Sequence, residues 1–481
     1  MTGLFFSCAA AETTFADQQL RPWRIVVNDD GDFEAPGDDP DLQKFLDRRF
    51  SATVATQVDA YFLNIASTDR LWDKAKARPQ DAMSQWAAHG DVPGHVDRGI
   101  RRYIDAAHAA GMEIFLAVRL NDIHDAWHET LTYPLKVQRP DLLLGRKGSA
   151  PDNALMRGHW SGLDWSSPVV RDHFREFLLW AAARWDFDGV ELDWFRHPLF
   201  FRLGEAQENI PNMTDFVRQM RAGLGAIGDA RGKRYLMTTR VPDSPRLALA
   251  TGFDVEQWLK EGLLDMLMVG GGYMPYGGRV KEFIDMAHRY GVHAYPCMNH
   301  FKDPQIMRSV AANFWALGAD GFYLFNWGGA EPGDKRLPTL HEMGSPATLA
   351  GRNKRFLADT GCSVIYVGHT NPVSQFPRRV VGGAPIELVV GDDVTSADVL
   401  SASLIVTVTG LDETEGIVLQ INGQPLPGSR VARFGAEAFH ADVAGTPMVH
   451  GINKINVGPG SGSLGRLDAH VTGVELLVKY E

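Results

Sequence analysis

The feature that most limits the fold of this chain is a repeated alternation of short apolar runs with longer stretches of helical period. Eight β-branched or aromatic runs occur between residue 24 and about residue 330. The expected strands are residues 24–27, 60–66, 113–120, 189–194, 234–240, 265–269, 293–298 and 321–326. Eight strand–helix units predict an α/β fold of the (β/α)8 TIM-barrel type. A doubly wound open sheet is disfavoured, because no Gly-rich phosphate turn follows the first strand.

The stretches between these runs have the apolar spacing of amphipathic helices. Clear examples are residues 96–111, 167–185, 214–230, 280–291 and 307–318. Ser167 and Thr214 are expected to be N-caps, and Gly111 is expected to end the first of these helices.

The helical period disappears after about residue 365, and short alternating runs replace it. Expected strands are residues 385–391, 403–411, 416–426, 453–458 and 473–480, with a hairpin turn at Asn422-Gly423. The chain is therefore expected to divide into an N-terminal segment (1–20), a catalytic barrel (21–360) and an all-β sandwich (371–481), with a proline-containing linker at 369–379.

Composition restricts the partners and the compartment. A net charge of -11 argues against nucleic acid as a partner, because such binding normally uses a basic face. No run of 18 apolar residues occurs, so no membrane span is expected. Residues 3–13 resemble the tail of an export signal, which favours a secreted or periplasmic protein over a cytoplasmic one. The three cysteines have no metal-like spacing, no disulfide framework is expected, and the oligomeric state stays open.

The fourth expected strand carries the strongest chemical signal. A period of two places Glu191 and Asp193 on one face and two aliphatic side chains on the other. The carboxylates should therefore point into the barrel, where Arg119 and Arg240 of the flanking strands can pair with them. Asp193, nearer the rim, is expected to act in catalysis, with Glu191 orienting it. The alternative is that both carboxylates only anchor a buried arginine network.

The run DGVELDWFRHP resembles the DGxDxDWE motif on strand four of the family 18 chitinases. It departs from that motif at Phe195, where the family has its acidic Glu, so substrate-assisted chitin hydrolysis is not supported. A nearer resemblance is to uncharacterised bacterial glycoside-hydrolase-like barrels with the patterns DGxELDxxRHP and RxNDxHD. These patterns stand at residues 188–198 and 119–125. The resemblance covers about residues 20–340 and implies a carbohydrate substrate.

A glycosidase generally needs two carboxyl groups, one to donate a proton and one to act as nucleophile or base. Asp193 is expected to be the nucleophile or base. The acid is expected to be Asp125, tuned by His124, with Asp243 and then Glu331 as the next candidates. The competing interpretation of the NDIHD run is a capped loop with solvated acids.

The remaining polar and aromatic groups at the strand ends are expected to bind substrate. They are His124, Arg119, Arg196, His197, Arg240, Asn299, His300, Asn326, Trp327 and Glu331. Trp327 is expected to be the platform under a sugar ring. Arginines and His300 can receive a sulfate or carboxylate, which favours an acidic polysaccharide.

Other classes remain as alternatives. Asp122, Asp193 and Asp243 follow strands three to five, as the magnesium ligands of enolase-like barrels do, but no strand-borne Lys base accompanies them. Strand one lacks the His-x-His of zinc amidohydrolases. Lys281 and Lys302 lie in helix or loop, which disfavours a Schiff-base aldolase. A barrel that only binds sugar is the non-enzymatic alternative. The sequence thus predicts a glycoside hydrolase with no cofactor and no metal.

Overall fold

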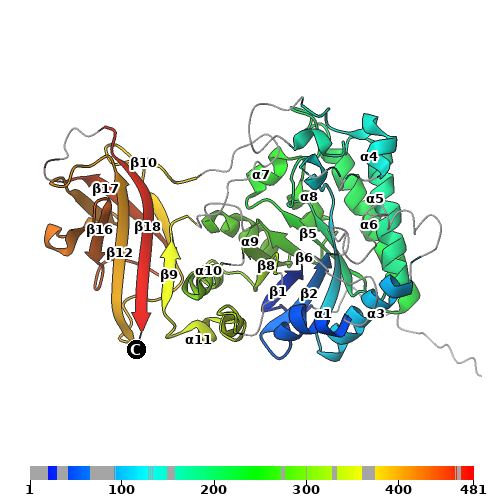
Figure 1. Cartoon of the computed structure of the whole chain (residues 1–481), viewed down its shortest axis with the longest axis horizontal. Coiled ribbons are helices and arrows are strands. Elements are labelled where there is room, and N and C mark those ends of the chain that lie inside the picture. The colour runs from blue at the N-terminus through cyan, green and yellow to red at the C-terminus, as the bar shows by residue number, and fades with distance from the viewer. Residues whose placement is uncertain are drawn as a thin grey trace, which may run out of the picture.

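The computed structural model describes residues 20–29, 42–64, 92, 94–127, 129, 132, 134–148, 158–271, 277–299, 301–327, 333–359, 374–460, 462 and 467–480. The chain forms a barrel with a sheet domain beside it (Figure 1). The expected export segment and two cysteines, Cys8 and Cys362, lie outside the described residues.

Eight parallel strands close into a barrel in chain order, which confirms the predicted fold class. The strands are β1 (Ile25–Asp29), β2 (Val58–Asn64), β3 (Glu113–Arg119), β4 (Gly189–Asp193), β5 (Leu236–Val241), β6 (Met266–Val269), β7 (His293–Asn299) and β8 (Phe322–Phe325). Their outward residues pack on helices and their inward residues fill the barrel, so nearly every strand position is buried.

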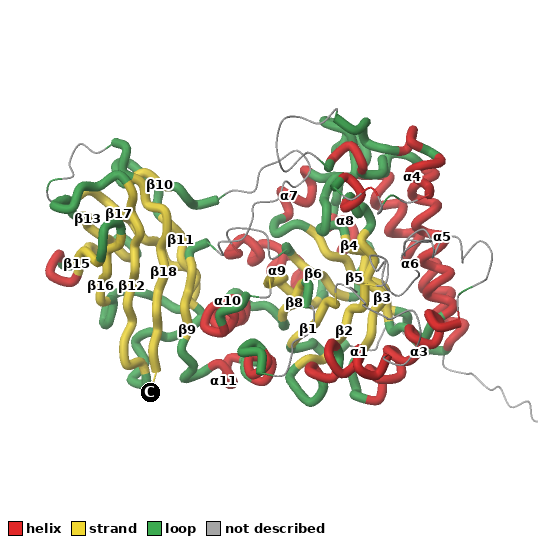
Figure 2. Tube along the Cα trace, in the orientation of Figure 1, coloured by secondary structure: helices red, strands yellow, loops and turns green. Residues whose placement is uncertain are grey.

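Helices follow the strands around the outside of the barrel (Figure 2). They are α1 (Leu42–Arg49), α3 (Gly94–Ala109), α4 (Pro134–Gln138), α5 (Pro168–Arg184), α6 (Ile210–Arg231), α7 (Pro245–Ala250), α8 (Val255–Lys260), α9 (Val280–Arg289), α10 (Pro304–Ala316) and α11 (Pro346–Leu349). The expected N-cap at Thr214 is wrong: α6 begins at Ile210, with Pro211 in its first turn. Thr214 instead lies buried inside the helix, and its hydroxyl accepts a hydrogen bond from Trp258.

Aromatic side chains fill the interior of the barrel. Phe62 and Phe115 stack with ring centroids 4.4 Å apart, and Trp23 meets Phe115 edge to face. Gly189 opens β4 because a Cβ there would lie 2.3 Å from the Phe115 ring. The packed interior leaves the carboxyl ends of the strands as the place for a site.

The C-terminal part is a pair of antiparallel sheets, as predicted. One sheet has the order β10 (Arg378–Arg379), β18 (His470–Tyr480), β12 (Val399–Thr409), β16 (Ala438–Asp442), β15 (Val431–Phe434), with β9 (Lys354–Leu357) also paired to β18. The other has the order β11 (Ile386–Val390), β17 (Gly451–Pro459), β13 (Ile417–Ile421), β14 (Gln424–Pro425). Asn422 and Gly423 both have positive φ, at 51° and 81°, and form the predicted hairpin turn.

Helix α10 joins the two parts, and it lies between them in Figures 1 and 2. Ser309 donates a hydrogen bond of 2.6 Å to the carbonyl of Arg355 in β9. Gly391, just after β11, touches the helix so closely that a Cβ would lie 2.2 Å from the carbonyl carbon of Ala312. A cavity of about 50 Å³ remains nearby, lined by the barrel and by Leu357 and Val389. Strand β9 lies within the expected barrel segment (21–360), yet it pairs with the sandwich.

Candidate active site

Asp193 ends β4 and is held by four N–H donors. The guanidinium of Arg240 donates from Nε to Oδ1 at 3.0 Å and from Nη2 to Oδ2 at 2.8 Å. The backbone N–H groups of Phe195 and Arg196 also donate to Oδ1, at 2.9 and 3.1 Å. This carboxylate is fixed in one orientation, and Oδ2 has a single donor among the described residues.

Glu191 lies one layer deeper and is fully buried. Its Oε2 accepts a hydrogen bond of 2.9 Å from the hydroxyl of Tyr323, and its Oε1 has no partner among the described residues. Burial, followed by the charge of Asp193, raises the pKa of Glu191 to about 8. Glu191 is therefore protonated at neutral pH, while Asp193 forms the ion pair with Arg240.

Substituting Gln for Glu191 should change the pH dependence of stability. Folded Glu191 keeps its proton up to a pKa of about 8, against an ordinary value of 4.5. Between these values the folded state binds the extra proton, so its contribution to stability is lost as the pH rises. The free energy of unfolding of E191Q, measured by urea denaturation from about pH 5 to pH 8, should fall less than that of the wild type. Parallel curves for the two proteins would show that Glu191 is ionised when folded.

The two arginines that were expected beside these carboxylates behave differently. Arg240 is fully buried, forks Asp193 and stacks over Phe325 at 4.0 Å. Arg119 approaches Asp122 Oδ2 at 3.8 Å and donates to Asn326 Oδ1 at 3.3 Å. Arg240 therefore pairs with Asp193 as expected, whereas Arg119 contacts Asp122 and Asn326 at the rim above β3.

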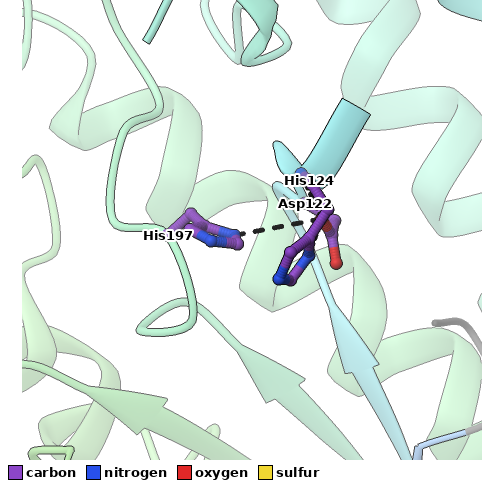
Figure 3. A group of neighbouring side chains, drawn as sticks. All are labelled: Asp122, His124 and His197. Atoms are coloured by element: carbon purple, nitrogen blue, oxygen red, sulfur yellow. Dashed lines mark hydrogen bonds and ion pairs between the residues drawn. The ribbon is translucent and has the colours of Figure 1, made fainter. Parts of the chain in front are cut away.

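A second cluster lies at this rim, formed by the residues after β3 and β4 (Figure 3). Asp122 Oδ1 lies 2.6 Å from His124 Nδ1 and accepts the His124 backbone N–H at 2.8 Å. His124 Nε2 lies 3.1 Å from Nη2 of Arg196. The His197 ring meets the His124 ring edge to face, with centroids 4.9 Å apart.

Positive groups in the cluster offset the effect of burial on the pKa of Asp122. Burial alone raises the pKa of Asp122, but His124, His197 and Arg119 outweigh it and hold the pKa well below its usual range. Burial and the nearby Arg196 lower the pKa of His197 well below its ordinary value. Asp122 is therefore ionised and His197 neutral at physiological pH. The Nδ1 of His197 is buried, makes no hydrogen bond among the described residues and lies 4.0 Å from Asp122 Oδ1.

Asp122, His124 and His197 offer ligand atoms within 4.8 Å of one another, so they are the described residues that can hold a metal ion. Their surroundings fit such an ion poorly. A histidine ligand normally donates its second ring N–H to an acceptor, whereas Nε2 of His124 faces the guanidinium of Arg196, which only donates. Arg119 adds a second positive charge beside Asp122. The three side chains are of the types that bind metal ions, but the two arginines beside them disfavour a bound cation.

The carboxylates that were expected to supply the acid lie elsewhere. Asp125 is buried in an ion pair of 2.9 Å with Lys136 and also accepts a hydrogen bond from Ser161. Both oxygens of this buried carboxylate are engaged by neighbouring side chains, so the structure does not favour the acid role of Asp125. Asp243 is ion-paired with Arg279 at 2.9 Å and lines the cavity against the sandwich. Burial raises its pKa to about 6. Glu331 lies outside the described residues.

The expected magnesium ligands do not share a site. Asp193 pairs with Arg240, Asp243 with Arg279, and Asp122 with His124. Each carboxylate thus has its own cationic or imidazole partner, which disfavours the enolase-like alternative.

The expected sugar platform is wrong, because Trp327 is fully buried and lies under the guanidinium of Arg336. A residue that was not among the expected binding groups is better placed. Trp127 is 50% exposed and lies 6.4 Å from the His197 ring. Trp127 lies two residues after the NDIHD run, and this proximity is the sequence feature that could have identified it as a binding residue. The Asn299 side chain and His300 lie outside the described residues.

The fold and the site define a (β/α)8-barrel protein with a C-terminal antiparallel β-sandwich and a polar, arginine-rich rim. No helix in the described part of the chain is long and apolar enough to cross a membrane.

Comparisons with known proteins give no family. No protein-family model and no curated protein sequence matches the chain. Among solved structures, the PgaB (BpsB) glycoside hydrolase domain from Bordetella bronchiseptica is 14% identical, with a TM-score of 0.46 over 68% of this chain and 99% of that chain. Alpha-L-fucosidase isoenzyme 2 from Paenibacillus thiaminolyticus is 13% identical, with a TM-score of 0.43 over 70% and 51%. A family 18 N-acetylglucosaminidase from Paenibacillus barengoltzii is 12% identical, with a TM-score of 0.38 over 67% and 99%. Similarities this weak carry no information on activity.

Proposed function

We propose that the protein is a glycoside hydrolase whose reaction takes place where β3 and β4 end. The observation that carries the proposal is Asp193, a carboxylate fixed by four N–H donors at a barrel strand end, directly above the protonated Glu191. An oriented carboxylate is what a glycosidase needs to act on an anomeric carbon, as nucleophile or as base.

Charge favours an acidic sugar as the substrate. Arg119, Arg196 and Arg240 supply three positive charges, against the two carboxyl groups of Asp122 and Asp193. Arg196 is half-buried and directly precedes His197, whose ring lies 6.4 Å from that of the exposed Trp127, so it is the arginine placed to meet a ligand. A guanidinium matches the oxygens of a carboxylate or sulfate, and an exposed indole matches the apolar face of a sugar ring.

A substrate screen tests this proposal. The purified protein is offered neutral, uronic-acid-containing and sulfated polysaccharides, and newly formed reducing ends are counted. We expect release from an anionic polysaccharide, with KM raised about tenfold or more in R196M, because a charge-assisted hydrogen bond contributes about 1.5–3 kcal/mol. Release from neutral polysaccharides alone would contradict the acidic substrate. Binding without release from any of them would leave a sugar-binding barrel.

A further inference from the structure

We propose that His124, held by Asp122, is the group that transfers the proton in this reaction. The inference rests on the proposed function and names its missing acid. Every candidate carboxyl group in the described part of the chain is engaged elsewhere. Asp193 is forked by Arg240, Asp125 is paired with Lys136, and Asp243 is paired with Arg279. Glu191 is fully buried beneath the rim.

His124 differs from these groups in its access. Its side chain is 33% exposed, compared with 5% for Asp193 and 1% for Asp125. It lies in the loop directly after β3, and β3 pairs with β4 in a register that sets Arg119 opposite Asp193. A proton donor on a neighbouring strand end is the arrangement that a bond held above Asp193 requires.

The contacts of the ring identify its tautomer. An arginine can only donate, so Nε2 of His124 accepts from Arg196 and carries the lone pair. Nδ1 then carries the hydrogen and donates it to Asp122 at 2.6 Å. Asp122 is locked in turn by the backbone N–H of His124. A carboxylate that fixes Nδ1–H and stabilises the imidazolium leaves Nε2 as the atom that exchanges protons.

Arg196 then couples protonation to the substrate. When a carboxylate or sulfate of the sugar takes the guanidinium, Nε2 loses its donor and accepts a proton from solvent. The neighbouring charges are Asp122, which favours the imidazolium, and Arg119 and Arg196, which oppose it, while His197 is neutral. A bound anion cancels one opposing charge. Binding of an acidic substrate would in this way favour the protonated form of His124 that the reaction needs.

The proton balance closes in a two-step displacement. In the first step Nε2–H gives its proton to the bridging oxygen, while the bond from that oxygen to the anomeric carbon breaks and its electron pair stays on the oxygen. The alcohol leaves, and Asp193 Oδ2 bonds to the carbon. In the second step the neutral Nε2 takes a proton from water, whose oxygen bonds to the carbon and releases Asp193. His124 ends protonated, as it began.

Nuclear magnetic resonance tests the dyad without any substrate. In protein labelled with ¹⁵N-histidine, long-range ¹H–¹⁵N correlations report which ring nitrogen carries the hydrogen, and H124Q identifies the signals. We expect His124 in the Nδ1–H form near neutral pH. An Nε2–H form would overturn the proposal. So would Zn²⁺, added at one equivalent, shifting the His124 and His197 signals together, because these rings would then be metal ligands.

Kinetics test the catalytic role on whichever polysaccharide the screen identifies. H124Q should lower kcat about 10²- to 10³-fold with little change in KM. On a 4-nitrophenyl glycoside of the same sugar, kcat/KM should fall much less, because it reports the first step and this leaving group needs no acid there. D122N should move the alkaline limb of the pH profile to lower pH, and D122E should restore part of the activity. His440 in the sandwich supplies the matched control, H440Q, with unchanged turnover.

The two proposals fail in different ways. A wild-type protein that cleaves no saccharide contradicts the glycosidase, while the tautomer still decides the dyad. An active wild type whose H124Q variant keeps its kcat contradicts the role of His124 alone.

Discussion

Replacing Asp193 with Asn should lower kcat by about 10⁴-fold, the size of effect seen when an enzyme loses a central catalytic group. The amide keeps the shape of the side chain and can still accept the N–H groups of Phe195 and Arg196. It cannot act as a nucleophile or a base, and its NH2 group would face the guanidinium of Arg240. The loss should be in kcat, measured by reducing-end release, with sugar binding retained.

Stability has to be separated from chemistry in that experiment. Arg240 is fully buried, and leaving a buried charge without its partner costs about 3–5 kcal/mol. The double variant D193N/R240M removes both charges and retains similar bulk, so it should recover most of the lost stability and none of the activity. A D193N protein that folds and turns over normally would remove Asp193 from the mechanism.

Replacing Gly391 with Ala should separate the sandwich from the barrel. The new Cβ would lie 2.2 Å from the carbonyl carbon of Ala312, and a helix backbone cannot move aside as a flexible side chain can. Overpacking of this kind costs about 1–3 kcal/mol, and here the strain falls on the contact between the two parts. We expect a lower Tm in scanning calorimetry and faster proteolysis between the barrel and the sandwich.

Gly428 supplies the matched control for this substitution. It lies in the same sandwich, and a Cβ added there would have no neighbouring atom within 4 Å, so G428A should leave both measurements unchanged. Unfolding of G391A at the wild-type temperature, with unchanged proteolysis, would show that the two parts do not rely on this contact.

The barrel was predictable from sequence because its signal repeats eight times. Each strand run is a short β-branched or aromatic segment, and each lies within a few residues of its expected position. Errors occurred where local preference competed with packing. Thr214 looked like a cap, yet the buried face of α6 needs it inside the helix. Strand β9 was missed because its four residues carry little period and are defined by pairing with a strand far along the chain.

The site was less predictable, because strand periodicity predicts which way a side chain points but not whether a ligand can reach it. The inward orientation of Glu191 and Asp193 and the pairing with Arg240 follow from a period of two. Periodicity does not show that Lys136 neutralises Asp125, or that Trp327 is covered while Trp127 is exposed. These facts depend on segments such as α4 that cross the strand ends from elsewhere in the sequence. The pairing of His124 with Arg196 depends likewise on two different loops.

The position of β9 also has a consequence for the order in which the molecule is assembled. Arg355 of this strand pairs with Glu475 of β18, 120 residues further along the chain. The barrel strands have all been synthesised by residue 325. They can close before the sheet that contains β9 has its central strands, β12 and β18. During translation β9 therefore lacks its partner while the whole sandwich is made. Phe356, fully buried in the finished protein, lacks its β18 neighbour Leu476 in that interval, so nascent chains stalled before β18 should bind chaperones and aggregate more than complete chains do.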